Sequence, residues 1–521
     1  MGPVLSFRGV EDKTWKVSAV IVTDGAAAEV TAGGAPAPGV ALWKVKSRTA
    51  YRHAFSFPVK AEASTGSYTA AGKTYKVAIP GESDAPRMAY ESCNGFSSSK
   101  LMKSVDDNNF LWKEMSARHA KAPYHLLLQG GDQVYADEMW ETQQVMKDWA
   151  ALSWKKGNAA SVTEAMSDAL TAFYFNLYVE RWSQPEVAKV LATVPSIAMW
   201  DDHDLIDGWG SYPEERQTCK VYGAIWRAAC KAFAVFQQHL DDTEQRPGAI
   251  GGTRPDATAA FPVTAGTFSY GYDVNGVSIL AIDMRSQRTA DEHVITREHW
   301  DEIFKWIDER PDDCHLIVMS SIPVVYPGFD TLETILAFVP GHQDLEDDMR
   351  DHWRSRPHKA ERLRMVHRLL GVSASKKIRV TVVSGDVHIA ALGIVESKRD
   401  PKGGSENIIN QLISSGIVHP GPGGAVLFAL RYLFDSDDEM DRGIVGRMAQ
   451  FPGSQTKFIG SRNYLSIEPD DRKKIRPEDR VRLWCNWVIE SEILAAEGEK
   501  RAPADYTKVI HALPLPLPPK P

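Results

Sequence analysis

The chain has 521 residues, of which 43% are hydrophobic and 25% are charged, a composition typical of a folded globular protein and not of a disordered or fibrous one. Its 60 Lys and Arg residues against 68 Asp and Glu residues give a net charge of -8. Overall charge therefore excludes a general attraction to nucleic acid or to an acidic membrane surface. The length suffices for one large domain with an appendage, or for several smaller domains.

The cysteines indicate a reducing compartment. Five are present, at widely spaced positions: Cys93, Cys219, Cys230, Cys314 and Cys485. An odd number at this spacing is not typical of a disulfide framework or of a paired zinc motif. The first residues contain no export signal, and the apolar run at 423–434 is short and interrupted by Arg431. We expect a cytoplasmic protein without a membrane span, in which the four cysteines other than Cys93 are free thiols.

Residues 1–85 contain short runs rich in Val, Thr, Tyr and Phe, separated by Gly, Pro and Asp at hairpin-like intervals. Such runs are typical of β-strands joined by tight turns. The pattern predicts a small N-terminal β-sandwich domain of the immunoglobulin or fibronectin kind.

From residue 86 onward, short apolar or β-branched runs alternate with long amphipathic segments. This alternation predicts a layered α/β domain over residues 86–470. Within it, residues 297–310 predict a helix with a buried aromatic face, and residues 360–371 predict a second helix with Gly371 as its C-terminal cap.

Residues 471–521 are predicted to form a C-terminal helix and a proline-rich tail. Five apolar residues of the segment 480–500 recur at helical spacing: Leu483, Trp484, Trp487, Val488 and Leu494. We expect this helix to pack against the body of the protein or to lie over the functional site as a lid. Residues 513–521, "LPLPLPPKP", predict an extended tail.

The predicted strands of the α/β domain share one feature, which is that polar side chains follow each strand at once. These strand ends carry Cys93 and Asn94, then Asp132, then Asp201 to Asp204, then Asp283 and Arg285, then Ser320 and Ser321, and finally Asp386 and His388. In open α/β sheets, ligands bind beyond the carboxyl ends of the strands. Six polar ends therefore predict a single crevice, with the loop "VHPGPGG" at 418–424 near its mouth.

The side chains at these ends offer carboxylate, imidazole, thiolate and phenolate groups, the last from Tyr135. A single Asp after Gly often shapes a turn, and a lone Cys or His is usually packed or hydrogen bonded. Turn chemistry does not explain the tandem Asp-Asp-His-Asp at 201–204 after an apolar run. Because so many acids in one crevice require cations, the sequence predicts sites for one hard and one intermediate metal ion.

Three blocks, "GGDQVYAD" at 130–137, "MWDDHD" at 199–204 and "SGDVH" at 384–388, resemble those of the calcineurin-like metallophosphoesterases in their alkaline phosphatase D (PhoD-like) branch. The segments "ESCN" and "IDMRSQR" strengthen the resemblance, which covers roughly residues 86–470. It implies a layered α/β/β/α sandwich and a metal-dependent phosphoesterase that acts on phosphomonoesters, phosphodiesters or both. "ESCN" replaces the Asp-x-His of most of the superfamily, as in the PhoD-like branch, which is associated with Fe³⁺ and Ca²⁺.

The resemblance implies roles for individual residues. Asp132 would bridge two metal ions, while Cys93 and Tyr135 would bind Fe³⁺. Asp202, with Asp201 as the alternative, would take the place of a metal-binding asparagine, and two further residues would replace the histidines of a Gly-His-x-His block. The implied metal ligands are thus Cys93, Asp132, Tyr135, Asp202, Asp386 and His388.

Three further residues would be catalytic: His203, Asn94 and Arg285. His203 would lie beside the phosphoryl group and stabilise or protonate the leaving oxygen after in-line attack by a hydroxide made available by metal coordination. Arg285 would bind a substrate phosphate, or form a structural salt bridge to an acid such as Asp283. Since Ser320 and Ser321 stand where the superfamily has a further histidine, the second metal should be Ca²⁺, with Mg²⁺ or Mn²⁺ as alternatives.

Other functions stay open. An inactive PhoD-like scaffold could act as a binding protein, although it should then have lost some of the implied ligands. A nuclease or nucleotide pyrophosphatase would share the chemistry, but the sequence shows no basic track interleaved with aromatic residues, so we expect a small phosphate-ester substrate and no nucleic acid partner. The alcohol part of the substrate and the oligomeric state stay open.

Overall fold

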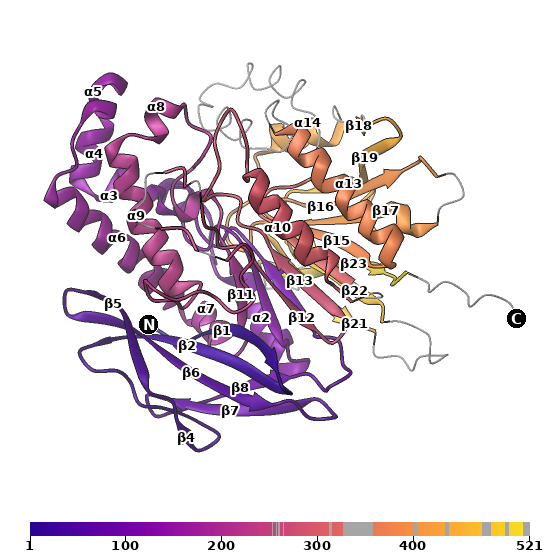
Figure 1. Cartoon of the computed structure of the whole chain (residues 1–521), viewed down its shortest axis with the longest axis horizontal. Helices are drawn as coiled ribbons and strands as arrows, with labels where there is room; N and C mark the ends of the chain where they lie inside the picture. Colours follow the sequence, from indigo (N-terminus) through magenta and orange to yellow (C-terminus); the bar gives the residue numbers. More distant parts are fainter. Residues whose placement is uncertain are drawn as a thin grey trace, which may run out of the picture.

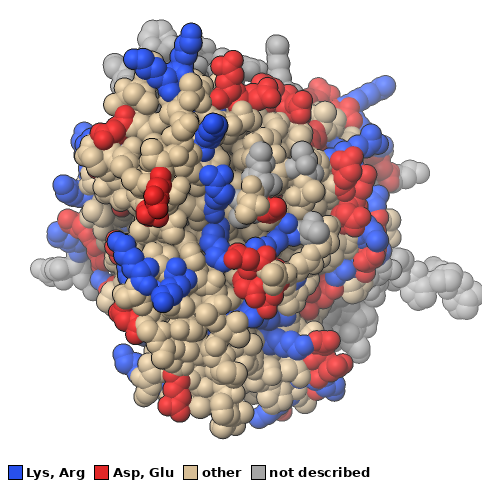
Figure 2. Space-filling view, turned by 60° about the vertical axis from the view of Figure 1, so that its left-hand side comes forward, with Lys and Arg blue, Asp and Glu red and all other residues tan. Residues whose placement is uncertain are grey.

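The computed structural model describes residues 1–252, 254–256, 258, 261–263, 265–311, 315–326, 358–400, 404–432, 437–470, 481–494 and 500–513. These residues form a mixed α/β fold with two large β-sheets and one small one (Figure 1). Within the described part of the chain, no helix combines the length and the apolar character needed to cross a membrane. Figure 2 shows basic and acidic side chains interspersed on the face it displays.

The first large sheet has ten strands in the described residues, and the strands at its centre run parallel. In spatial order they are β23 (Ala502–Ile510), β22 (Leu483–Ser491), β21 (Asn463–Pro469), β9 (Met88–Glu91), β10 (Leu126–Gly130), β11 (Ser196–Met199), β1 (Val4–Glu11), β2 (Thr14–Asp24), β6 (Arg48–Pro58) and β5 (Gly39–Val45). β9, β10 and β11 are buried along their whole length. Burial on both faces explains why they read as continuous apolar runs.

The second large sheet has nine strands in the described residues, and again its centre is parallel. Its strands are β12 (Tyr270–Val274), β13 (Val277–Ala281), β14 (His315–Ser320), β15 (Arg379–Ser384), β17 (Ile408–Ser414), β16 (Ala390–Ser397), β19 (Ile444–Ala449) and β18 (Asp438–Asp441), with β20 (Phe458–Ile459) paired to β16. A small sheet contains β4 (Ala35–Pro36), β3 (Val30–Ala32), β7 (Ser64–Ala70) and β8 (Lys73–Ile79).

Helices cover the large sheets on their outer sides (Figure 1). Their bounds are α1 (Ser99–Ser104), α2 (Phe110–Lys121), α3 (Met139–Thr142), α4 (Gln144–Ala150), α5 (Trp154–Ala159), α6 (Glu164–Trp182), α7 (Pro185–Leu191), α8 (Glu214–Gln217), α9 (Lys220–Phe236), α10 (Arg297–Asp308), α13 (Lys359–Lys376) and α14 (Gly424–Tyr432), with 3₁₀ turns η1 (Ala136–Glu138), η2 (Asp202–Asp204) and η3 (Ser405–Asn407). The hydroxyls of Thr163 and Thr296 accept backbone N–H bonds at the starts of α6 and α10. Such caps satisfy N–H groups that the helix itself leaves unbonded.

The period of two along β10 divides its side chains between two cores. Leu126 and Leu128 point into a cluster shared with Ile279 and Ile317 of the second sheet. Leu127 points the other way, into a cluster with the apolar faces of α2, α6, α7 and α9. Because α10 and α13 bury their apolar faces on the far side of the second sheet, helices flank both sheets and the parallel strands are covered on both faces.

The N-terminal residues do contain two sheets, as expected of the segment 1–85. One of them, however, continues into the first large sheet, because β1 pairs in parallel with β11 at Ser6 and Ser196. Strand pairing therefore does not stop at residue 85. The division of the chain into domains at residues 85 and 470 stays a prediction.

The helices predicted at 297–310 and 360–371 are confirmed as α10 and α13, but Gly371 is not a cap, because α13 continues to Lys376 and Lys377 takes the left-handed conformation. The prediction of a C-terminal helix is wrong, because residues 483–491 form β22, which pairs with β21 and β23. Leu483, Cys485, Trp487 and Ile489 are buried together in one core cluster, while Val488 is buried in another, so the period that matters is two and not 3.6. The predicted tail lies outside the described residues apart from Leu513.

The cysteines of the described chain are free. Cys93, Cys219, Cys230 and Cys485 are all buried and unbonded to one another, while Cys314 lies outside the described residues.

Candidate functional site

Loops that follow parallel strands of both large sheets meet at one place. Cys93 follows β9, Asp132 follows β10, Asp202 follows β11 and Asp386 follows β15. The loops are joined through their backbones, since the N–H of Cys93 donates to Gly131 O at 3.2 Å and the N–H of Asn94 donates to Asp132 O at 2.8 Å. The predicted convergence of these strand ends is therefore present in the structure.

Four of the predicted ligand residues have strained backbones. The φ angles are 55° at Cys93, 53° at Asp132, 70° at Asp386 and 52° at His388. Side chains other than glycine rarely adopt this left-handed region, and residues held there cluster at functional sites. In each loop the backbone turns sharply within four residues of the strand end.

Glycines permit these turns to approach one another. At Gly131, where φ is 104°, a Cβ atom would lie 2.7 Å from Cβ of Asp201. At Gly385 a Cβ atom would lie 2.4 Å from Oγ of Ser92. Because such distances are too short for real Cβ contacts, any other residue would force the strand ends apart. This explains why glycine precedes Asp132 and Asp386.

Three buried carboxylates form the centre of the site, which we call the acidic crevice: Asp132, Asp201 and Asp202. One oxygen of each lies within 4.8 Å of the others. Oδ1 of Asp132 is buried without a hydrogen-bond partner in the described residues. Burial, followed by the neighbouring Cys93 and Asp201, raises the pKa of Asp132 well above its usual range. This arrangement disfavours a carboxylate and would be relieved by a cation.

Arg285 lies beneath the acidic crevice and is fully buried. Its Nε atom donates to Asp201 Oδ1 at 2.5 Å, its Nη1 atom donates to Trp209 O at 3.0 Å, and Nη2 lies 3.5 Å from Asp202 Oδ1. The structural salt bridge that the sequence left open for Arg285 is present, with Asp201 and Asp202 as its partners, and Asp283 accepts from the backbone N–H of Arg285. Arg285 is thus placed to hold the two acids and not to face a substrate.

The thiol of Cys93 lies against the acidic crevice. Its Sγ atom is 3.4 Å from Asp132 Oδ2 and 3.0 Å from Ser415 Oγ. Burial, against opposing hydrogen bonds from Ser415 and Ser92, raises the pKa of Cys93 to about 11. A thiol of this kind stays protonated at neutral pH unless a metal ion displaces the proton.

A stack of aromatic rings borders the crevice on another side. The ring of Tyr135 lies between those of His203 and His419, at centroid distances of 4.2 and 5.5 Å. His388 stacks on His419 at 3.6 Å, and its Nε2 atom is 3.2 Å from the hydroxyl of Tyr135. Burial, then the nearby His419 and His203, lowers the pKa of His388 well below its usual value, so its imidazole is neutral and able to act as a ligand.

His203 is held by an acidic partner. Its Nδ1 atom donates to Asp137 Oδ2 at 2.5 Å, and its Nε2 atom lies 3.9 Å from Asp207 Oδ1. Although burial alone lowers the pKa of His203, the carboxylates of Asp137 and Asp202 outweigh it and raise the pKa well above its usual value. The carboxylate fixes the orientation of the ring, because the proton on Nδ1 leaves Nε2 for another contact.

Asn94 does not point into the crevice. Its Oδ1 atom accepts hydrogen bonds from Trp112 Nε1 at 2.9 Å and from Arg181 Nε at 3.1 Å, and its Nδ2 atom donates to Gln133 O at 3.4 Å. The amide is therefore used in joining the loop after β9 to helices α2 and α6.

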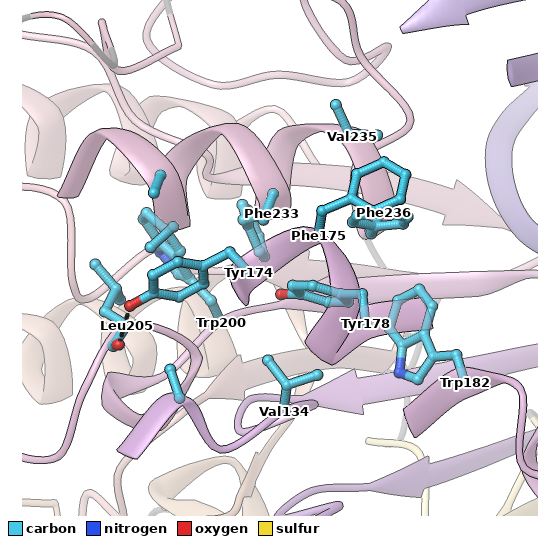
Figure 3. Close-up of a cluster of buried hydrophobic side chains, with 14 of the residues drawn as sticks. Val134, Tyr174, Phe175, Tyr178, Trp182, Trp200, Leu205, Phe233, Val235 and Phe236 are labelled. Atoms are coloured by element: carbon cyan, nitrogen blue, oxygen red, sulfur yellow. Dashed lines mark hydrogen bonds between the residues drawn. The ribbon is translucent and has the colours of Figure 1, made fainter. Parts of the chain in front are cut away.

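The loops that carry Asp132 and Asp202 rest on helices α6 and α9. Figure 3 shows the residues that make this contact, which include Val134, Tyr174, Trp200, Leu205 and Phe233. The hydroxyl of Tyr174 donates to Leu205 O, and the ring of Trp200 stacks on Phe233 at 4.4 Å. Packing on these helices helps to hold the acids in place.

Asp204 joins the two loops directly. Its Oδ1 atom accepts from the backbone N–H of Gln133 at 3.1 Å and of Val134 at 3.3 Å. The fourth residue of the Asp-Asp-His-Asp tandem is therefore structural.

Two site residues were missed in the sequence, Asp137 and His419. Asp137 closes the "GGDQVYAD" block, and its distance from a strand end gave no indication of a role. His419 follows β17, a seventh polar strand end, within the loop "VHPGPGG". Its Nδ1 atom donates to Pro420 O at 2.9 Å, which leaves Nε2 as an acceptor. The expectation that the site has no further imidazole is wrong in this respect.

The residues present fit a metal centre. Three buried carboxylates, a buried thiol, a phenol and neutral imidazoles lie together, and the unpartnered Asp132 Oδ1 gives the donor set an unsatisfied atom. Oxygen ligands suit hard cations, whereas thiolate and imidazole suit transition metals.

Comparisons with known proteins agree with this chemistry. Residues 67–343 and 336–437 match the family described as PhoD related phosphatase. YGR266W, an uncharacterized protein of Saccharomyces cerevisiae, is 28% identical over 377 residues, which are 62% of this chain and 52% of that protein. The chain thus spans about half the length of this curated relative.

Among solved structures, that of PhoD aligns over 98% of this chain and 90% of its own, with a TM-score of 0.57 and 12% identity. At this identity the likeness concerns the fold. Since the family match extends over more than half of the sequence, the chain belongs to the PhoD related phosphatase family.

Proposed function

We propose that the protein is a metal-dependent phosphoesterase that hydrolyses small phosphate esters, monoesters or diesters, at the acidic crevice. The observation that supports this most strongly is the cluster of Asp132, Asp201 and Asp202, whose oxygens lie within 4.8 Å of one another in a buried place. Cations among carboxylates so close would stabilise their ionised forms. A phosphate ester, itself an anion, would be drawn to the same cations.

The metal ligands would be divided between two ions. Cys93 and Tyr135 would hold Fe³⁺, Asp132 would bridge, and Asp202, Asp386 and His388 would complete the set with Ca²⁺, for which Mg²⁺ or Mn²⁺ are alternatives. When bound, these ions would supply the Lewis acidity that activates water and neutralises phosphoryl charge. His419 lies against His388 and is a further imidazole within reach of this group.

The protein's own part in the reaction would be to place a proton. Asp137 accepts the Nδ1 proton of His203, and with Asp202 it raises the pKa of the ring, so the imidazolium would also carry a proton on Nε2 for the leaving oxygen. Stacking on Tyr135 at 4.2 Å keeps the imidazole plane fixed. Arg285 and Asn94 would contribute by positioning, the former by holding Asp201 and the latter by tying the loop of Cys93 to α2 and α6.

Absorption spectroscopy tests the iron assignment. If thiolate and phenolate both ligate Fe³⁺, ligand-to-metal charge transfer should colour the purified protein, and Tyr135→Phe should remove the visible band. Tyr124→Phe is the matched control, because Tyr124 is buried but donates to Ser466 Oγ at 3.0 Å. A colourless and fully active wild type without iron would contradict the roles of Cys93 and Tyr135.

Hydrolysis of p-nitrophenyl phosphate and of bis-p-nitrophenyl phosphate, measured with and without a chelator, tests the activity itself. We expect chelator-sensitive release of nitrophenol from at least one of the two, and the ratio separates monoesterase from diesterase. Equal rates with and without exhaustive chelation would contradict metal dependence, and no release from either ester would favour the inactive scaffold.

We also infer a cytoplasmic location, supported by the free and buried Cys93, Cys219, Cys230 and Cys485. Thiol titration of the denatured, unreduced protein should find five thiols. A deficit of two would indicate a disulfide.

A further inference from the structure

A second site of unbalanced charge lies away from the acidic crevice. We call it the basic groove: it has a volume of about 800 Å³ and runs between β1, β2, β6 and the β12 edge of the second sheet. Arg8, Lys16, Arg52 and Arg310 line it. None of its lining residues belongs to the acidic crevice, and its volume is that of a small-molecule pocket.

Three of the four lining cations have carboxylate partners. Arg52 Nη2 donates to Glu244 Oε1 at 2.8 Å. The other two pairs are Lys16 with Glu11 and Arg310 with Asp273. The side chains of Glu11, Glu244 and Asp273 are 68%, 36% and 44% exposed, which places these pairs toward solvent.

Arg8 is different. Within the described residues, its guanidinium has no carboxylate within salt-bridge distance, and its one hydrogen bond is from Nη1 to Gln238 O at 2.9 Å. Arg246 lies behind it and donates to the same carbonyl at 3.3 Å, again without a carboxylate partner in the described chain. Burial, then repulsion from Arg246, lowers the pKa of Arg8 to about 10, so its charge persists at neutral pH but is poorly compensated.

A purely structural role accounts for part of this arrangement. Arg8, Arg52 and Arg246 all donate to the carbonyls of Gln238 and His239, just beyond the end of α9, where cations are favourable. In the described residues, however, a backbone carbonyl uses only one N–H of Arg8, and Arg8 lines the groove. A guanidinium with free donors in a concave place is suited to bidentate contact with phosphate or carboxylate oxygens.

We propose that the basic groove binds a small molecule through a phosphate group that contacts Arg8. Four lining cations face three lining carboxylates, and Arg246 adds a positive charge behind Arg8, so the excess charge matches a phosphate dianion better than a carboxylate. The ring of Tyr272, which packs edge-on against Phe7 at 5.0 Å, and Phe55 provide apolar walls for the rest of the ligand. β1, β6 and β12, which carry Arg8, Phe55 and Tyr272, are labelled in Figure 1.

Phosphate binding at the groove has to be separated from phosphate binding at the acidic crevice. We therefore choose Asp132→Ala as the background, since it lacks the bridging carboxylate of the proposed phosphoesterase site. Isothermal titration with inorganic phosphate, and with acetate as the carboxylate probe, is then compared between this variant and Asp132→Ala with Arg8→Gln. Glutamine keeps a donor for Gln238 O but removes the charge.

We expect the Asp132→Ala protein to bind phosphate in preference to acetate, and Arg8→Gln to weaken that binding by about tenfold or more. Lys13→Gln is the matched control: Lys13 does not line the groove, and the change removes one positive charge from its exposed pair with Glu82, so binding should change by no more than about twofold. Thermal unfolding of each variant verifies that it is folded. No phosphate binding to folded Asp132→Ala, or equal binding with and without Arg8→Gln, would overturn the proposal, whether or not the crevice proves to be a phosphoesterase site.

Discussion

The acidic crevice and the basic groove are opposite in charge and alike in construction. In the crevice, oxygens of Asp132, Asp201 and Asp202 lie within 4.8 Å of one another, and the buried guanidinium of Arg285 pairs with Asp201 and Asp202. In the groove, Arg8 and Arg246 share the carbonyl of Gln238. Each place holds more charge of one sign than its own side chains neutralise.

The difference between the two lies in depth. The crevice acids are at most 3% exposed and the backbone at Asp132 is strained, so their charge has to be balanced from within the site. The groove is open, and Arg8 is half-buried, so water already screens part of its charge. We infer that the acids of the crevice need bound cations to stay ionised. An anion bound in the groove would be a ligand, and the protein would not need it in order to fold.

Among the substitutions proposed here, Asp132→Asn should have the largest effect on the acidic crevice. We expect kcat/KM for phosphate-ester hydrolysis to fall by at least about 10⁴-fold, because a bridging ligand serves both ions. Without metal, the free energy of unfolding of the variant should be no lower than that of the wild type. The reason is that the change removes a buried carboxyl group that resists ionisation. Asp301→Asn, at a surface pair with Arg364, is the control. Activity within tenfold of the wild type would contradict the assignment.

Arg285→Met should reveal how much of the crevice charge the protein balances by itself. Removing one partner of a buried pair leaves an uncompensated charge, so the free energy of unfolding should fall by about 3–5 kcal/mol in urea titrations of the metal-free protein. Arg364→Met, which breaks an exposed pair, should cost at most about 1 kcal/mol. A loss below about 1 kcal/mol for Arg285→Met would show that Asp201 is already neutral.

Asp137→Ala tests whether the carboxylate positions His203. We expect kcat to fall by about 10- to 100-fold with little change in KM, because the ring loses the partner of its Nδ1 atom while the crevice acids stay in place. Asp137→Asn keeps an acceptor and should recover part of the rate. Equal kcat in wild type and Asp137→Ala would contradict the positioning role.

A smaller effect is expected at His315, a buried imidazole that has neither a metal nor an acid beside it in the described chain. Burial is the main cause that lowers the pKa of His315 to about 4, and its Nε2 atom donates to Val481 O at 2.7 Å. Between about pH 6.5 and 4 the unfolded chain binds a proton that the folded chain does not, so stability is complete above this window and falls as the pH falls.

The expected loss at His315 is about 1–3 kcal/mol across that window. Urea unfolding at pH 7 and pH 5 should give a shallower pH dependence for His315→Gln than for the wild type. Parallel slopes would show that His315 is protonated in the folded protein.

The polar residues that follow the strands could be predicted, because each lies next to its strand in the sequence. Cys93, Asp132, Asp202 and Asp386 each follow an apolar run, and parallel strands place their carboxyl ends at one edge. The residues of other loops that contact these side chains could not be predicted. His419, for example, reaches the site only because β17 lies beside β15. Arg285 shows the same limit, since sequence could not tell a substrate contact from the buried pair with Asp201 on another strand end.

For a similar reason the C-terminal helix was predicted wrongly, and the pairing of the N-terminal strands with the rest of the chain was not predicted. Residues 483–491 carry apolar side chains at both helical and strand periods, and their pairing with β21 and β23 decides between the two. Residues 1–85 contain clear hairpins, but the parallel pairing of β1 with β11 joins segments 190 residues apart. The basic groove, which this pairing helps to create, leaves no motif in the sequence.

The most direct test of the account is the metal content of the purified wild type and of Asp132→Asn, measured by inductively coupled plasma mass spectrometry. Because the acidic crevice contains more buried negative charge than Arg285 offsets, the wild type should retain bound metal ions through gel filtration, with iron among them, and the variant should lose them. A fully active wild type without metal, or a variant with unchanged metal content, would contradict the claim that the crevice is a metal centre.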